Sequence, residues 1–355
     1  MAAVSAPLDA PAQPSSQTLL SFFAVGDCGY EGPDVERLAA AMQRYADEVA
    51  RPPAFVLGLG DNFYPNGIDG VDDPRFRTVW SDVFLKHAHL RVPWRMILGN
   101  HDWTKSAQAQ IDLTLDRLHN TLGLWQMPAA CYSFNVSIPL ADADDGSCGA
   151  ATIGEALPFP PLGSADPSPP AATDGQCFTI DFFGIDTSGV QRSVRNRQPH
   201  LREQLRTDIG RLAAHLSAST ASARVVFAHH PLFTAGSHHS AIGAALQDEY
   251  KLGDCLVDGR VAAYFTGHEH VMQCHAERGV HHFVCSGTGV DGVRFYQGRD
   301  ASIRLDWVDE SCSAAFVACE VVRDETPPRR LQLVVRFVAV CDLSIQHMVV
   351  VPLGS

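Results

Sequence analysis

The chain has 355 residues, enough for one large domain or two ordinary ones, and its 46% hydrophobic and 19% charged residues exclude a wholly disordered protein. Its 27 basic and 40 acidic residues give a net charge of −13, which disfavours partnership with nucleic acid or an anionic membrane surface. The same charge repels phosphate-bearing substrates, so a phosphate site would need a local reversal of the field. No run reaches the ~18 consecutive apolar residues of a membrane helix.

Residues 1–17 are rich in Ala, Pro and Ser and are expected to form a flexible tail. They have neither the basic start nor the apolar core of a signal peptide, which favours the cytoplasm for the chain as written. Ten cysteines and a glycosylation sequon at Asn135 suit instead a secreted or lysosomal protein whose leader was removed. Several cysteines lie in apolar runs, where buried free thiols are the alternative to disulfides. Compartment and oligomeric state stay open.

Short apolar runs recur along the chain, each followed by a polar or glycine-rich turn. They predict strands buried on both faces, at Phe22–Val25, Phe55–Leu59, Arg95–Leu98, Arg224–Ala228, Ala262–Thr266 and His282–Cys285. Apolar residues at helical spacing lie between them, at Asp34–Ala50, Phe76–His87 and His200–Ser217. Strands that alternate with helices predict an α/β fold.

The later part of the chain departs from this alternation twice. Residues 139–176 are crowded with Pro, Gly, Ala, Asp and Ser, and we expect a mobile surface insertion there. The last apolar runs, Ala315–Val322, Leu331–Val340 and Ile345–Val351, have no clear helices between them and predict antiparallel strands at the edge of the same domain. Because no linker divides the chain, residues 18–352 are expected to form a single domain.

Five of the apolar runs end in polar signatures. These are Gly26-Asp27-Cys28-Gly29, Gly60-Asp61-Asn62-Phe63-Tyr64, Gly99-Asn100-His101-Asp102, Ala228-His229-His230-Pro231 and Gly267-His268-Glu269-His270. Ligands of α/β sheets bind beyond the carboxyl ends of the strands, so these side chains are expected to meet in one place. Each signature alone is compatible with an ordinary turn. The ordered set of five predicts a site.

Asp, Asn, His and Tyr side chains together can hold two cations. Carboxylates supply charge and one of them can bridge, while imidazoles suit Zn, Fe, Mn or Ni. Two metal ions about 3.5–4 Å apart are a common device for phosphoester hydrolysis. Bound cations would also reverse the repulsion that the net charge creates, because they dominate the local field.

The five motifs resemble those of the calcineurin-like metallophosphoesterases and, more closely, those of the small, tartrate-resistant type of purple acid phosphatase. Two details select this branch: Gly-Asp-x-Gly in the first motif, and Tyr64 three residues after Asp61 in the second. The resemblance runs from roughly residue 20 to 350, apart from 139–176. It implies a four-layer αββα sandwich of two packed mixed sheets flanked by helices.

The resemblance also assigns roles to residues. A ferric ion would be held by Asp27, Asp61, Tyr64 and His270, and a divalent ion (Fe, Zn or Mn) by Asp61, Asn100, His229 and His268. Asp61 would bridge the two ions. His101 and His238 would face the substrate, although the adjacent His239 leaves the second assignment open. His230 stands where the family has a tyrosine, so an exchange of roles with His229 also stays open.

The activity that the resemblance implies is hydrolysis of phosphomonoesters by a metal-bound hydroxide, with an acidic pH optimum. The substrate would be a small phosphate ester or a phosphoprotein. One alternative is a Zn or Mn metallophosphoesterase acting on phosphodiesters or phosphoproteins. A second is a non-catalytic protein that binds metal or phosphate. Asp102 is expected either to orient His101 or to serve as a turn residue.

Overall fold

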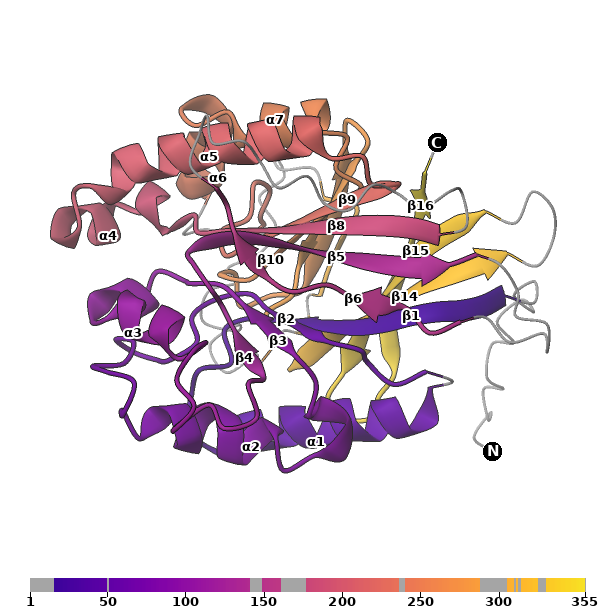
Figure 1. The fold of residues 1–355 in the computed structure, drawn as a ribbon, viewed down its shortest axis with the longest axis horizontal. Coiled ribbons are helices and arrows are strands. Elements are labelled where there is room, and N and C mark those ends of the chain that lie inside the picture. The colour runs from indigo at the N-terminus through magenta and orange to yellow at the C-terminus, as the bar shows by residue number, and fades with distance from the viewer. Residues whose placement is uncertain are drawn as a thin grey trace, which may run out of the picture.

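The computed structural model of the chain describes residues 16–49, 51–140, 149–160, 177–235, 240–287, 305–309, 311, 314–324 and 330–354. His238, predicted to face the substrate, lies outside the described residues, as does the alternative His239. Two β-sheets pack face to face, and helices cover the outer face of each (Figure 1). The expected four-layer α/β sandwich is therefore confirmed.

The first sheet has a parallel half and an antiparallel half. Its order is β16 (Ile345–Leu353), β15 (Leu331–Ala339), β14 (Ala315–Asp324), β1 (Ser16–Val25), β2 (Val56–Gly58), β3 (Trp94–Met96) and β4 (Trp125–Gln126). Strands β1 to β4 are parallel, whereas β14, β15 and β16 are antiparallel to their neighbours. The C-terminal strands are thus the antiparallel edge predicted from the sequence.

The second sheet also has a parallel centre. Its order is β13 (Trp307–Val308), β11 (Gln273–Glu277), β12 (Val280–Val284), β10 (Ala263–Thr266), β9 (Ala223–Ala228), β8 (Cys177–Ile185), β5 (Cys131–Pro139) and β6 (Thr152–Ile153), with β7 (Leu157–Pro158) also paired to β5. Strands β8, β9, β10 and β12 are parallel. Both sheets therefore direct the carboxyl ends of parallel strands toward a common edge.

Helices form the two outer layers. They are α1 (Pro33–Glu48), α2 (Asp82–Phe84), α3 (Ala107–Asp112), α4 (Arg192–Arg197), α5 (Leu201–Ala218), α6 (Ser240–Asp248) and α7 (Leu252–Asp258). Helices α1 and α2 lie below the first sheet in Figure 1, and α5 to α7 lie above the second. The helix predicted at Phe76–His87 is instead a π-helical turn, Phe76–Ser81, that leads into the short α2.

Strand β1 shows why both sheet faces are buried. Phe22 points between the sheets, where its ring stacks on Phe55 at 4.9 Å and meets Phe182 edge-on at 5.7 Å. Phe23 points to the other face and packs against Tyr45 of α1 at 6.1 Å. Successive side chains of a strand alternate between faces, so an unbroken apolar run fills the core on one side and the helix layer on the other.

Two segments are more ordered than the sequence predicts. Strand β1 begins at Ser16, which pairs with Asp324, so the predicted tail ends two residues too late. Within the predicted mobile insertion, residues 149–160 contain β6 and β7, and Phe159 is buried. The apolar side chain of Phe159 anchors this stretch in the core beneath α5, which its Pro-rich composition conceals. The rest of the insertion, 141–148 and 161–176, lies outside the described residues.

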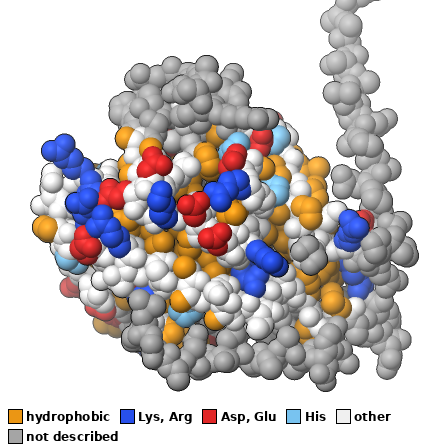
Figure 2. Space-filling view, turned by 90° about the horizontal axis from the view of Figure 1, so that it is seen from above, with side chains coloured by type: hydrophobic (Ala, Val, Ile, Leu, Met, Phe, Trp, Pro, Cys, Tyr) orange, Lys and Arg blue, Asp and Glu red, His pale blue; other side chains and the backbone are white. Residues whose placement is uncertain are grey.

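The eight cysteines of the described chain carry free thiols, and several of them are buried. None of the helices in the described ranges is long and apolar enough to cross a membrane. The outer face of the upper helices mixes both signs of charge (Figure 2). There, Arg202 and Arg206 both donate to Glu249 at 2.7 Å.

Candidate metal centre

The two sheets are joined where their parallel strands end. Gly26, directly after β1, forms an isolated bridge with Ser286, which follows β12. The Gly26 N–H donates to the carbonyl of Cys285 at 2.7 Å, and the Gly287 N–H donates back to the Gly26 carbonyl at 2.8 Å. The loops that follow β1, β2 and β3 in one sheet therefore face those that follow β9 and β10 in the other.

The backbone at this edge is bent sharply at three of the predicted ligands. Asp27, Asp61 and His268 have φ values of 57°, 53° and 68°, a left-handed conformation that is unfavourable for residues with a side chain. A Cβ on Gly99 would lie 2.2 Å from Asp61 Oδ1, so only glycine lets the third loop approach this carboxylate. Strain of this kind at three predicted ligands that lie close together is typical of a functional site.

The first donor cluster is centred on Tyr64. Its phenolic oxygen lies 2.8 Å from Asp61 Oδ2, 3.2 Å from Asp27 Oδ1 and 3.1 Å from His270 Nε2. His270 Nε2 is 3.7 Å from Asp27 Oδ1. Donors about 2.1 Å from one cation and roughly 90° apart lie about 3 Å from each other. The four predicted ligands of the ferric ion therefore have the spacing of a coordination shell.

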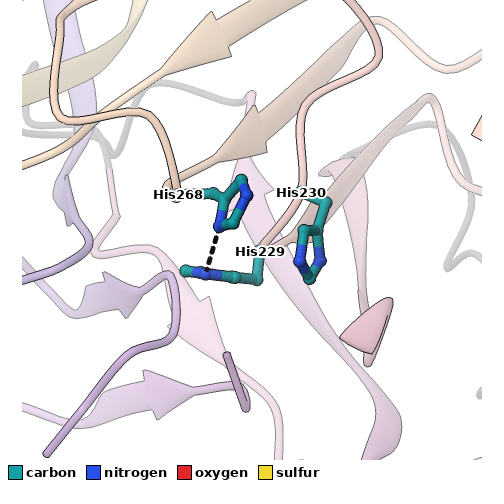
Figure 3. Close-up of side chains that lie close together, drawn as sticks. All are labelled: His229, His230 and His268. Carbon is teal, nitrogen blue, oxygen red and sulfur yellow. Dashed lines mark hydrogen bonds between the residues drawn. The ribbon is translucent and has the colours of Figure 1, made fainter. Parts of the chain in front are cut away.

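The second donor cluster is centred on His229. Its Nε2 lies 3.2 Å from Asn100 Oδ1, 3.2 Å from His268 Nδ1 and 3.5 Å from Asp61 Oδ2 (Figure 3 shows the two histidines). Asp61 Oδ2 thus belongs to both clusters. One oxygen shared by two sets of donors is the arrangement expected of a carboxylate that bridges two ions.

Backbone groups orient these ligands. The N–H of His268 donates to Asp27 Oδ2 at 2.8 Å, which turns Oδ1 of this carboxylate toward Tyr64. The N–H of His101 donates to Asp61 Oδ1 at 2.9 Å, which leaves Oδ2 as the shared oxygen. His229 Nδ1 lies 2.8 Å from the Leu59 carbonyl, so Nδ1 carries the proton and Nε2 is free to bind a cation.

The electrostatics of the cluster favour bound cations. Burial, and then the charges of Asp61 and Asp27, raise the pKa of the Tyr64 phenol well above its usual range. Burial raises the pKa of Asp61, but His229 and His101 together outweigh burial and hold this pKa below its usual range. A buried phenol beside two carboxylates loses its proton only when positive charge is supplied nearby.

The residues present fit two metal ions. Each cluster offers four side-chain donors, counting Asp61 in both, and the oxygen and imidazole donors are those that suit Fe, Zn or Mn. Asp27, Asp61 and His229 each place a possible ligand atom within 4.8 Å of the others. The structure brings all seven predicted metal ligands together.

His230 lies behind the cluster. One of its ring nitrogens is within 4.8 Å of those of His229 and His268, so it forms part of a second possible metal group (Figure 3). However, its Nδ1 bonds the Thr187 hydroxyl at 2.8 Å, and its Nε2 points toward Gln191 at 3.5 Å. The geometry therefore favours His229 over His230 as the ligand in the exchange that the sequence left open.

His101 lies at the open side of the cluster. Its Nδ1 is 2.6 Å from the Pro65 carbonyl, which places the proton on Nδ1 and directs Nε2 toward the metal donors. Nε2 is 4.0 Å from Asp61 Oδ2, and the side chain is 39% exposed. His101 is thus the predicted site residue that is accessible to a substrate while facing both clusters.

The two roles expected for Asp102 were to orient His101 or to serve as a turn residue, and its contacts are those of a loop residue. Among the described residues its carboxylate does not bond the His101 ring; it is buried and accepts N–H bonds from Gly99 at 2.8 Å and from Asn62 at 3.1 Å. It thereby ties the loop after β2 to the loop after β3. Gln110, which also donates to it at 2.8 Å, was missed entirely. No local pattern links a glutamine in α3 to these loops.

A second unpredicted contact involves Tyr30. Its ring stacks on that of Tyr64 at 4.0 Å with only 9° between the planes. The Tyr64 ring is thus packed against Tyr30 and also lies near His101, whose ring is 4.6 Å from it. A tyrosine directly after a Gly-Asp-x-Gly motif is the signal that could have indicated it.

This fold and donor set define a metal-dependent phosphoesterase. The chain belongs to the calcineurin-like phosphoesterase family, whose sequence profile matches residues 20–272. It is 27% identical over 279 residues to purple acid phosphatase 7 of Arabidopsis thaliana, covering 79% of this chain and 73% of that protein. It is also 27% identical over 321 residues to human tartrate-resistant acid phosphatase type 5, covering 86% and 85%. The resemblance to purple acid phosphatases is thereby confirmed.

A solved structure supports the fold. GAP50, the anchor in the inner membrane complex of Plasmodium, superposes with a TM-score of 0.67 over 96% of this chain and 90% of its own. The two sequences are only 16% identical, so this likeness concerns the fold alone.

Proposed function

We propose that this protein hydrolyses phosphomonoesters at acidic pH with a ferric ion and a divalent ion (Fe, Zn or Mn). One observation carries the proposal: the Tyr64 oxygen lies within 3.2 Å of donor atoms of Asp27, Asp61 and His270. The same Asp61 oxygen is also 3.5 Å from His229 Nε2 in the second cluster. The similarity to purple and tartrate-resistant acid phosphatases supports the same activity.

The chain's own residues organise the reaction. When bound, the two cations would neutralise the charge of a substrate phosphate and lower the pKa of water. Asp61, clamped by the N–H of His101, would keep the two ions at a fixed separation. The Leu59 carbonyl holds His229 through Nδ1, so the imidazole ring keeps one orientation in which Nε2 faces the metal donors.

His101 supplies the proton. With Nδ1 held by the Pro65 carbonyl, Nε2 is the atom that can donate to the leaving oxygen of the ester. The similarity to purple and tartrate-resistant acid phosphatases is why we propose an acidic optimum. The substrate is a small phosphate ester or an exposed phosphate on a protein, and the net charge of −13 argues against nucleic acid or a membrane surface as a partner.

The alternative is a Zn or Mn enzyme that cleaves phosphodiesters or phosphoproteins. To separate the two, hydrolysis of p-nitrophenyl phosphate and of its bis-ester is measured from about pH 4 to about pH 9. The proposal predicts at least a tenfold preference for the monoester and a maximum below pH 7. His101→Ala lowers kcat, whereas a histidine at the distant surface, His89→Ala, leaves it unchanged.

Two outcomes overturn the proposal. A preference for the bis-ester with an alkaline maximum would select the phosphodiesterase alternative. Protein that holds two metal ions but turns over neither substrate would select the non-catalytic alternative, a protein that only binds metal or phosphate.

A further inference from the structure

A cavity lies away from the metal centre, where the edges of the two sheets approach each other. It has a volume of about 410 Å³ and is lined by β3, by the segment before β4 and by residues 153–156 beside β6. This volume is within the range of roughly 300–1,000 Å³ typical of small-molecule sites. None of the lining residues belongs to the metal donors or to the loops that carry them.

A buried cation forms one wall of the cavity. Arg95 is only 3% exposed, its guanidinium carbon lies 4.5 Å from the centre of the Phe134 ring, and its Nη2 donates to the Gly154 carbonyl at 2.8 Å. Its Nε is buried without a hydrogen-bond partner, and within the described ranges no carboxylate lies at ion-pair distance. A buried charge is normally paired, so this guanidinium has an unmet requirement for an anion.

The neighbouring charges limit which anion fits. Burial lowers the pKa of Arg95, and the charge of Glu155 at the cavity's edge counters this only in part. A second cation, Arg117, lines the exposed side of the same cavity. Because Glu155 repels additional negative charge, a monoanion suits the site better than a dianion. A carboxylate also matches the two parallel N–H bonds that a guanidinium can donate.

Aliphatic side chains form part of the cavity's lining. Leu115, which lines it, is 79% exposed, and Leu157, next to the lining segment 153–156, is 52% exposed. Ile153 and Pro128 add aliphatic surface inside. An exposed leucine is unremarkable alone, but aliphatic side chains beside a charged group in one cavity indicate a ligand with an apolar body.

We propose that this cavity binds a small aliphatic carboxylate, whose head group pairs with Arg95 and whose chain lies against Leu115 and Ile153. The site is separate from the metal centre and does not depend on the phosphatase activity proposed above. An aliphatic carboxylate is a different class of ligand from the phosphate esters proposed for the metal centre.

The test is calorimetric titration of the full, metal-loaded protein with octanoate, in saturating inorganic phosphate so that the metal centre is occupied. Octanoate is expected to bind at least tenfold more tightly than octanol or acetate. Arg95→Gln is expected to weaken octanoate binding at least tenfold, or about 1.4 kcal/mol. Arg260→Gln removes the same charge from an exposed position elsewhere and is expected to leave the affinity unchanged.

A second variant keeps the proposal testable if Arg95→Gln does not fold. Leu115→Glu changes a side chain that is 79% exposed, so the fold is preserved, and the added carboxylate should weaken octanoate binding at least fivefold. Hydrolysis of p-nitrophenyl phosphate should not change. Equal binding of octanol, displacement of octanoate by phosphate, or an unchanged affinity in Leu115→Glu would each overturn the proposal.

Discussion

Replacing Asp102 by Asn tests whether one buried carboxylate holds the metal loops in place. Oδ2 accepts from the Gly99 N–H at 2.8 Å, and Oδ1 accepts from Gln110 Nε2 at 2.8 Å and from the Asn62 N–H at 3.1 Å. The described partners of both oxygens are therefore all donors. The amide of Asn would face a donor with its own NH₂ group whichever way it turned.

The expected cost follows from this geometry. At least one buried N–H loses its acceptor, which costs about 1–3 kcal/mol, and the remaining bonds lose the strength that the charge gives them. We expect Asp102→Asn to lower the free energy of unfolding by about 3 kcal/mol, or roughly 100-fold in the folding equilibrium. Because Gly99 and Asn62 precede and follow metal ligands, affinity for the ions should also fall by about 10–100-fold.

Urea unfolding and competition with a chelator measure the two effects separately. Asp208→Asn is the matched control: Asp208 is 4% exposed and accepts from Arg211 at 3.0 Å and Gln204 at 3.1 Å, but it lies on α5. It should lose stability and keep its metal affinity. If the free energy of unfolding of Asp102→Asn lies within about 0.5 kcal/mol of that of the original protein, and the variant retains its ions, the carboxylate does not organise the loops.

Three further predictions use the same assays. Gly99→Ala places a Cβ 2.2 Å from Asp61 Oδ1 and should abolish metal binding. The control Gly210→Ala, with nothing within 4 Å of its Cβ, should raise the free energy of unfolding by about 0.5–1 kcal/mol. If Gly99→Ala still bound metal, the close approach of Gly99 to Asp61 would not be required. His101→Ala should lower kcat about 100-fold or more without changing urea stability, and unchanged turnover would refute its role. Burial raises the pKa of Asp186 to about 6, above its unfolded value, so stability is lost as the pH rises from about 4 to about 6. Asp186→Asn should flatten that slope, measured by urea midpoints, and an unchanged slope would argue against the raised pKa.

Most of the fold follows from local patterns. Apolar runs long enough to fill both faces of a strand predicted β1, β2 and β3 of the first sheet and β9, β10 and β12 of the second, because each run carries its own signal. The parallel strand β8 was not among the predicted runs. The start of helix α1 differs by one residue: Pro33 occupies the first turn, where its missing N–H costs nothing. The order of strands, and the pairing of β14 with β1, depend on contacts between distant parts of the chain that no local pattern encodes.

The site was predictable to the extent that its residues follow strands directly. Asp27, Asp61 and Asn100 each come one or two residues after an apolar run, and the shared edge of the sheets brings them together. The sequence left two roles open for Asp102 and did not single out Gln110, because Asp102 accepts from the Asn62 N–H of another loop and Gln110 donates its side-chain amide to Asp102. The contacts that Asp102 makes with Asn62 and Gln110 become visible only when these segments are placed in space.

The visible absorption spectrum of protein purified without chelators tests the central claim most directly, that Tyr64 and its neighbours hold a ferric ion. The account predicts a broad mid-visible band from an iron-bound phenolate, lost in Tyr64→Phe and kept in Tyr30→Phe, since Tyr30 only stacks on that ring. A colourless protein that contains two metal ions and hydrolyses phosphate esters, with a spectrum unchanged by Tyr64→Phe, would contradict it.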